Sequence, residues 1–93
     1  MELKRIFNYK ELLDSEGSFI GYDKLRELVK RLTGSFVIIN VEGYKTHKKG
    51  ILRYGKGLYV DGVYEGVYLE TKKMERFIPF KMINEIYINK EVI

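Results

Sequence analysis

Glycines that interrupt a long series of strand-like segments are the feature that most constrains the fold of this chain. In residues 35–88, short runs of β-branched, aliphatic and aromatic side chains are separated by glycines or by short polar turns. A glycine inside a strand pattern, such as Gly55 or Gly57, marks a bulge or a sharp bend. Sharp bends in consecutive short strands are typical of a small, closed or nearly closed β-barrel.

Strand positions follow from the alternation of apolar and polar residues. The first segment is apolar on both faces, which predicts a strand that is covered on both sides. The dipeptide Asp61-Gly62 stands between two alternating segments and predicts a hairpin with a type I′ turn. We therefore expect strands at residues 35–42, 50–60, 63–71, 76–79 and 84–89, with one tight turn at 80–83.

The residues before the first strand predict a short helix. Asn8 and Glu11 have the spacing of a capping box, so this helix should begin at Tyr9 and end at Gly17. Residues 3–7 fit a helical face and an edge strand equally well, and both readings stay open.

A second helix is predicted from apolar residues at helical spacing. Leu25 begins a stripe that repeats at i, i+3, i+4 and i+7, and Gly34 is placed to cap its end. This helix is expected to form a lid over one end of the barrel. The predicted fold is α+β, with one domain over residues 1–93: a helical segment at 1–34, then a small five-stranded, strongly bent antiparallel β-barrel at 35–89.

Composition excludes several classes of site. The chain has no cysteine, so a disulfide framework, a thiolate metal site and a cysteine nucleophile are impossible, and a cytoplasmic address is expected. No apolar run approaches the roughly 20 residues of a membrane-spanning helix, so no membrane partner is expected. Alanine, glutamine and tryptophan are also absent while lysine, glutamate and isoleucine are abundant, which favours a thermophile origin.

One stretch concentrates positive charge. Residues 43–57 contain five cations and no acidic residue, with aromatic side chains between them. Cations along a surface attract phosphates, and aromatic faces stack on exposed bases. The candidate nucleic-acid-binding residues are therefore Tyr44, Lys45, His47, Lys48, Lys49, Arg53, Tyr54 and Lys56.

No pattern predicts an enzyme, a cofactor or a metal site. The order Gly50, Gly55, Lys56 resembles a phosphate-binding loop, but Gly57 stands where a serine or threonine would hold magnesium. His47 has no acidic neighbour in the sequence, so we interpret it as a surface residue of the basic stretch. Along the predicted hairpin, Glu65 is interpreted as a solvent-exposed side chain.

The order of elements resembles the Sm-like small β-barrel over about residues 25–88. Gly50-Ile51-Leu52 is similar to the glycine-x-leucine entry of that family's bent second strand. Residues 78–83 have the spacing of its isoleucine-arginine-glycine-x-x-isoleucine segment, with Pro79 and Phe80 in place of the arginine and glycine. The base-reading loop has no counterpart, so the resemblance implies the architecture and not the uridine pocket.

Two functions follow as hypotheses. The first is a non-enzymatic barrel that binds RNA or DNA through the basic stretch, with little sequence preference and with affinity that falls as salt rises. The second is a protein-interaction or self-assembly module that pairs its open strand edges in a homo-oligomer and uses Tyr64 and Tyr68 as a contact face.

Overall fold

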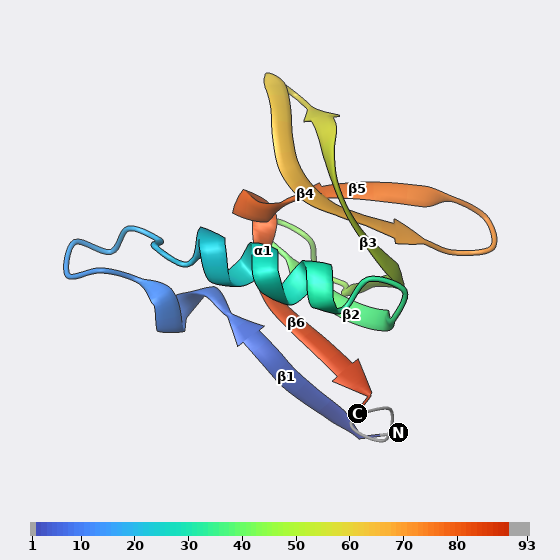
Figure 1. Cartoon of the computed structure of the whole chain (residues 1–93), viewed down its shortest axis with the longest axis horizontal. Helices are drawn as coiled ribbons and strands as arrows, with labels where there is room; N and C mark the ends of the chain where they lie inside the picture. Colours follow the sequence, from blue (N-terminus) through green and yellow to red (C-terminus); the bar gives the residue numbers. More distant parts are fainter. Residues whose placement is uncertain (1, 90–93) are drawn as a thin grey trace.

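A computed structural model describes residues 2–89 of the chain. Strands make up most of it, with one α-helix and two short 3₁₀ helices between them (Figure 1). In chain order the elements are β1 (Leu3–Asn8), η1 (Tyr9–Leu12), α1 (Tyr22–Arg31), β2 (Phe36–Val41), β3 (Lys48–Tyr59), β4 (Gly62–Glu70), β5 (Glu75–Pro79), η2 (Phe80–Met82) and β6 (Ile83–Asn89).

All six strands belong to one antiparallel sheet with the order β1-β6-β2-β3-β4-β5. The first strand pairs with the last, with Leu3 opposite Asn89. Within residues 2–89, β1 and β5 are the two edges and no ladder joins them, so the sheet is open. The prediction of an α+β fold with a five-stranded, closed or nearly closed barrel is therefore wrong: the fold is mostly β, and β1 adds a sixth strand beyond β6 and leaves β5 as a free edge.

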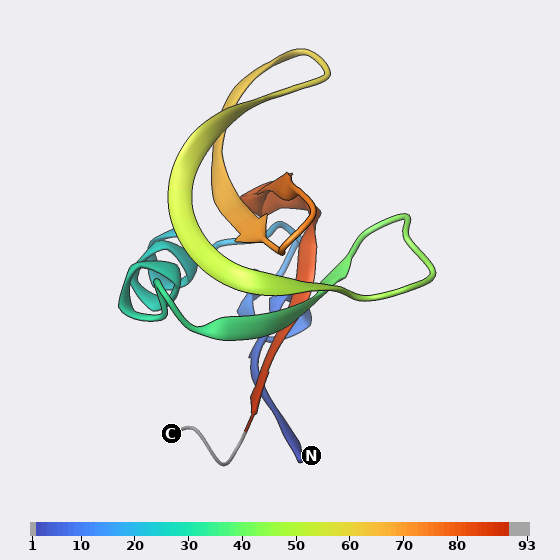
Figure 2. The same cartoon turned by 90° about the vertical axis from the view of Figure 1, so that its right-hand side faces the viewer.

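The strong bend that the glycines predict is present in β3. Figure 2 shows this strand sweeping through a wide curve from its pairing with β2 to the β3–β4 hairpin. Gly55 lies opposite Gly66, and a Cβ atom added to Gly66 would lie 2.3 Å from the carbonyl oxygen of Ile78. Only glycine admits so close an approach of β5, so this pair allows the curved strands to pack.

The first predicted helix, at residues 9–17, is wrong: a strand comes before it, and a single short turn stands in its place. Residues 3–8 form β1, because pairing with β6 supplies backbone hydrogen bonds that a local helix would otherwise make. Asn8 does cap the following segment, since its Oδ1 accepts from the Lys10 amide at 3.2 Å. The capped segment is a single 3₁₀ turn, and Asp14 then stabilises a loop by accepting from the amides of Glu16 and Ser18.

The second predicted helix is confirmed as α1, which lies in mid-chain across one face of the sheet (Figure 1). Leu25 and Val29 are fully buried, and Gly34 adopts φ +91° beyond the helix end. Within the described residues, no helix combines the length and the apolar character needed to cross a membrane. The core between helix and sheet consists of Phe7, Leu25, Val29, Val37, Ile39, Val41, Leu52, Val67, Leu69, Ile78, Phe80, Ile83 and Ile86.

The hairpin predicted from Asp61-Gly62 exists, but its turn lies one residue earlier. Tyr59 pairs with Gly62, so Val60 and Asp61 form the turn. Among the non-glycine residues at 2–89, Val60 has positive φ, at +33°, and Asp61 does not. The predicted type I′ turn at Asp61-Gly62 is therefore wrong, because type I′ needs positive φ at both central residues.

Candidate functional site

The basic stretch of the sequence is distributed over two sides of the β2–β3 hairpin. Successive residues of a strand point to opposite faces, so Lys48 and Lys49 face different surfaces. Lys45, His47 and Lys49 line a groove on one face of the sheet, while Tyr44 and Lys48 line a pocket on the other side. Arg53, Tyr54 and Lys56 lie further along β3.

A broad groove crosses the face formed by β1, β6, β2 and the start of β3. Paired residues of three adjacent strands form the floor of this groove: Tyr87 lies opposite Ile38, and Ile38 lies opposite Lys49. Its volume of about 670 Å³ falls within the range of roughly 300–1,000 Å³ that is usual for ligand sites. This basic groove is lined by Leu3, Ile38, Lys45, Thr46, His47, Lys49 and Tyr87.

Two aromatic rings meet in the basic groove. The rings of His47 and Tyr87 lie edge to face, with their centroids 5.9 Å apart. Burial, followed by interaction with Glu85, raises the pKa of the Tyr87 hydroxyl, which therefore stays protonated near neutral pH. Ile38 lies beside Tyr87 in the same row of the sheet, so apolar and aromatic surface is continuous there.

In the part of the chain that the structure describes, no ion pair compensates the cations of the basic groove. Within residues 2–89, no carboxylate lies within 4.0 Å of the ammonium group of Lys45 or Lys49. Glu85 interacts with Tyr87 but accepts hydrogen bonds from Asn40 at 2.8 Å and Arg5 at 3.0 Å. These bonds, the one from Asn40 first, lower the pKa of Glu85 and tie its charge to neighbours other than the two lysines.

Further along β3, the predicted residues Arg53 and Tyr54 are held by contacts within the protein. Arg53 forms an ion pair with Glu75 at 2.9 Å and lies over the Tyr68 ring at 4.4 Å. The hydroxyl of Tyr54 donates to Glu65, and Lys56 lies opposite Glu65 in the strand register.

Among the residues that line the groove, sequence reasoning missed Leu3, Ile38, Thr46 and Tyr87, and of these Tyr87 is the one that offers a ring. The alternation of Ile86 and Ile88 in the predicted last strand places Tyr87 on the opposite face from these two residues. A strand tyrosine is usually a packing residue or one member of a cross-strand pair, so alternation alone does not mark Tyr87 as a site residue. Its pairing with Ile38 on β2 is a long-range contact that no local pattern indicates.

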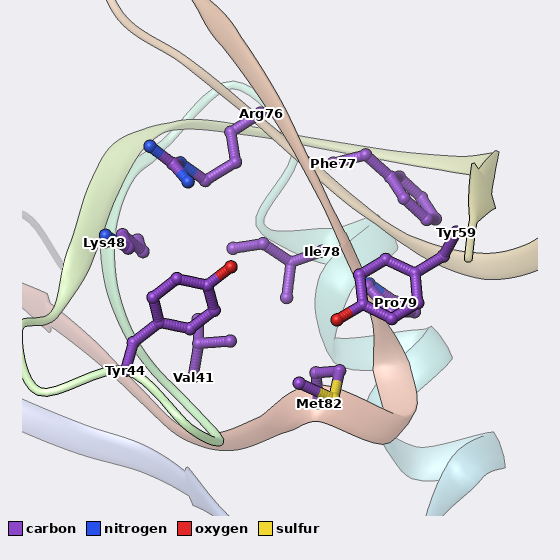
Figure 3. Close-up of a pocket in the computed structure, with 9 residues that line it drawn as sticks. All are labelled: Val41, Tyr44, Lys48, Tyr59, Arg76, Phe77, Ile78, Pro79 and Met82. Atoms are coloured by element: carbon purple, nitrogen blue, oxygen red, sulfur yellow. The ribbon is translucent and has the colours of Figure 1, made fainter.

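The pocket on the other side of the hairpin is small and partly aromatic (Figure 3). Its cavity volume is about 30 Å³. Among the described residues, no group of three histidine, aspartate or glutamate side chains is placed to hold a metal ion. This tyrosine pocket is lined by Val41, Tyr44, Lys48, Tyr59, Arg76, Phe77, Ile78, Pro79 and Met82.

Comparison with known proteins adds no relative to this description. No protein-family model, curated protein or solved structure matches the chain. The resemblance to Sm-like barrels therefore stays a prediction, and a function has to be argued from the geometry of the groove.

Proposed function

We propose that the protein binds single-stranded nucleic acid in the basic groove, with little dependence on base sequence. One observation carries the proposal: the row Tyr87–Ile38–Lys49 places aromatic, apolar and cationic groups side by side on an open sheet face. In the described chain no carboxylate pairs with Lys45 or Lys49, so both lysines can contact phosphates, while Tyr87 and His47 offer rings on which bases stack.

The shape of the groove favours a single strand over a duplex. Double-stranded DNA is read by elements that protrude into a groove of the nucleic acid, such as a helix or a two-stranded ribbon. The basic groove is instead a concave surface with Tyr87 on the strand row of its floor and His47 in the adjoining loop, where an unstacked base can enter. Ring stacking is tolerant of base identity, so weak sequence preference is expected.

Binding of a fluorescent ten-nucleotide strand, measured by anisotropy, tests this proposal. The double variant Lys45→Gln/Lys49→Gln should weaken binding about tenfold, since it removes two phosphate contacts. Tyr87→Ala should weaken it about 5- to 50-fold, the range of a lost stacking contact. The matched control is Lys72→Gln/Lys73→Gln, which removes the same charge from an exposed loop outside the groove and should change affinity by less than about twofold.

Two results would contradict the proposal. If the control variant weakened binding as much as the groove variant, general positive charge rather than the groove would hold the strand. If a duplex of the same sequence bound more tightly than the single strand, stacking in the groove would not be the mode of binding.

Self-association is the second candidate function. Within the described chain, β1 and β5 each pair on one side alone, so both could add a strand from another copy. Both edges are short, and β1 carries Lys4 and Arg5, features that discourage pairing between edges. In the proposed contact face, the Tyr64 hydroxyl donates to Asp61 and the Tyr68 hydroxyl to the Lys56 carbonyl. The groove is therefore the better supported site.

A further inference from the structure

The tyrosine pocket combines three kinds of group that together suit one kind of ligand. Its floor is apolar, formed by Val41, Ile78 and Met82. The hydroxyl groups of Tyr44 and Tyr59 point into it from two sides (Figure 3). Lys48 and Arg76 also line it, so hydrogen-bond donors and positive charge converge on a small space.

Neither cation of this pocket has an acidic partner in the part of the chain that the structure describes. The Lys48 ammonium lies 4.7 Å from the centroid of the Tyr44 ring, and an Arg76 nitrogen lies 3.7 Å from the sulfur of Met74. Arg5, Arg26 and Arg53 by contrast each contact a carboxylate. Arg76 and Lys48 are both partly exposed, so their charges are open to an anion that enters the pocket.

We propose that the tyrosine pocket binds the terminal phosphate of a phosphomonoester. Arg76 presents a planar fork of donors that matches phosphate oxygens, and Lys48 adds a second charge. The hydroxyl groups of Tyr44 and Tyr59 donate to the remaining oxygens. A phosphomonoester is close to a dianion at neutral pH and therefore suits two cations better than a phosphodiester, which carries a single charge.

The size of the pocket separates a terminal phosphate from larger ligands. A cavity of about 30 Å³ has no room for a nucleotide, so the rest of the ligand must lie outside its mouth. The phosphate could belong to the end of a nucleic-acid strand or to a small phosphorylated molecule. The inference does not rest on the proposed function, because the pocket and the basic groove lie on different sides of the β2–β3 hairpin.

The test compares ten-nucleotide strands that carry a 5′-phosphate, a 3′-phosphate or hydroxyl groups at both ends, together with inorganic phosphate as a separate probe. Anisotropy gives strand affinities, and amide shifts in the NMR spectrum of the full chain report inorganic phosphate. If a strand end is the ligand, one phosphorylated strand should bind at least about fivefold more tightly than the unphosphorylated strand. If a small molecule is the ligand, the strands should bind equally while inorganic phosphate shifts the amides of Tyr44, Lys48 and Arg76.

Two variants keep the inference falsifiable. Arg76→Gln should abolish the phosphate preference or the phosphate-induced shifts and leave binding of the unphosphorylated strand unchanged. Tyr59→Phe removes one hydroxyl while it preserves the ring, and it should reduce either signal by about threefold or more. Lys72→Gln is the matched control and should leave both signals intact.

The inference is overturned if no phosphorylated strand binds more tightly and inorganic phosphate shifts no pocket amide. It is also overturned if Arg76→Gln and Tyr59→Phe leave the signals at the level of the unsubstituted protein. Failure of the proposed function is seen separately, because the unphosphorylated strand and the Lys45→Gln/Lys49→Gln variant report on the basic groove alone.

Discussion

At the scale of a single residue, Val60 holds a backbone conformation that its side chain disfavours. It adopts φ +33° at the tip of the β3–β4 hairpin, and the residue is 95% exposed. A β-branched residue is strained at positive φ, whereas glycine is not. Val60→Gly should therefore remove strain at little cost in packing and raise the free energy of unfolding by about 1 kcal/mol, measured by urea denaturation.

Val63 provides the matched control for this substitution. It lies on the same hairpin with an exposed side chain and is not among the residues with positive φ. Val63→Gly should lower the free energy of unfolding by about 0.5–1 kcal/mol, because glycine weakens a strand that was not strained. Equal changes in the two variants would show that backbone strain at Val60 is not the cause.

The position of this turn illustrates a limit of local sequence signals. Asp61-Gly62 correctly indicates a hairpin but not its register. The register is fixed by residue pairs further along β3 and β4: Leu52 pairs with Leu69, and Tyr54 pairs with Val67. Shifting them by one residue would turn buried side chains to the opposite face, so core packing outweighs the preference of the turn.

At the scale of elements, an ion pair that is supported by an additional hydrogen bond connects α1 to β4. Arg26 donates from Nε and Nη2 to the two carboxylate oxygens of Glu65, each at 2.6 Å, and the Tyr54 hydroxyl donates to the same group. Arg26 first, and then Tyr54, lower the pKa of Glu65 from 4.5 to about 2. The folded protein therefore favours the ionised carboxylate, and this stabilisation is present above pH 4.5 and lost as the pH falls towards 2.

This ion pair predicts a specific pH dependence of stability. The unsubstituted protein should lose about 1–3 kcal/mol of unfolding free energy from Glu65 between pH 5 and pH 2. Glu65→Gln should be less stable at pH 7 and lack this part of the pH dependence, as measured by urea denaturation at each pH. Glu75→Gln is the control, because Glu75 pairs with Arg53 at the surface and should contribute little. The assignment fails if both variants keep the full pH dependence.

The contact between α1 and β4 also shows why the role of Glu65 was not predicted. Its position in an alternating strand suggested a solvent-exposed side chain, whereas α1 covers it and Arg26 binds it. The two residues are 39 positions apart in the sequence. The helix and the strand were each predicted from local patterns, but their packing depends on the three-dimensional path of the chain.

At the scale of the whole molecule, local patterns predicted β2 to β6 and α1 but not the shape of the sheet. Strand alternation is local and can be read from neighbouring residues, whereas the ladder from Leu3 to Asn89 joins the two ends of the described chain. That ladder adds a sixth strand and makes an open sheet. It also limits what could be predicted of the groove: Lys45, His47 and Lys49 are close in sequence, but Leu3 and Tyr87 reach it from β1 and β6.

The charge of the whole molecule leads to a prediction that distinguishes electrostatic attraction of phosphates from stacking of bases on a ring. The net charge is +4, but only cations that replace counterions on the strand affect how binding depends on salt. Two lysines line the basic groove, so log affinity should fall with log salt with a slope of about −1.4, at roughly 0.7 for each phosphate contact on a single strand.

Two groove variants should change this plot in different ways. Lys45→Gln/Lys49→Gln should bring the slope close to zero, because no phosphate contact remains in the groove. Tyr87→Ala should lower affinity at every salt concentration and leave the slope unchanged, because stacking releases no counterions. Anisotropy titrations between 50 and about 300 mM salt measure both quantities over the range in which counterion release dominates. A slope that Lys45→Gln/Lys49→Gln leaves unchanged would place the phosphate contacts outside the groove, and a slope altered by Tyr87→Ala would mean that the ring positions the lysines instead of stacking on bases.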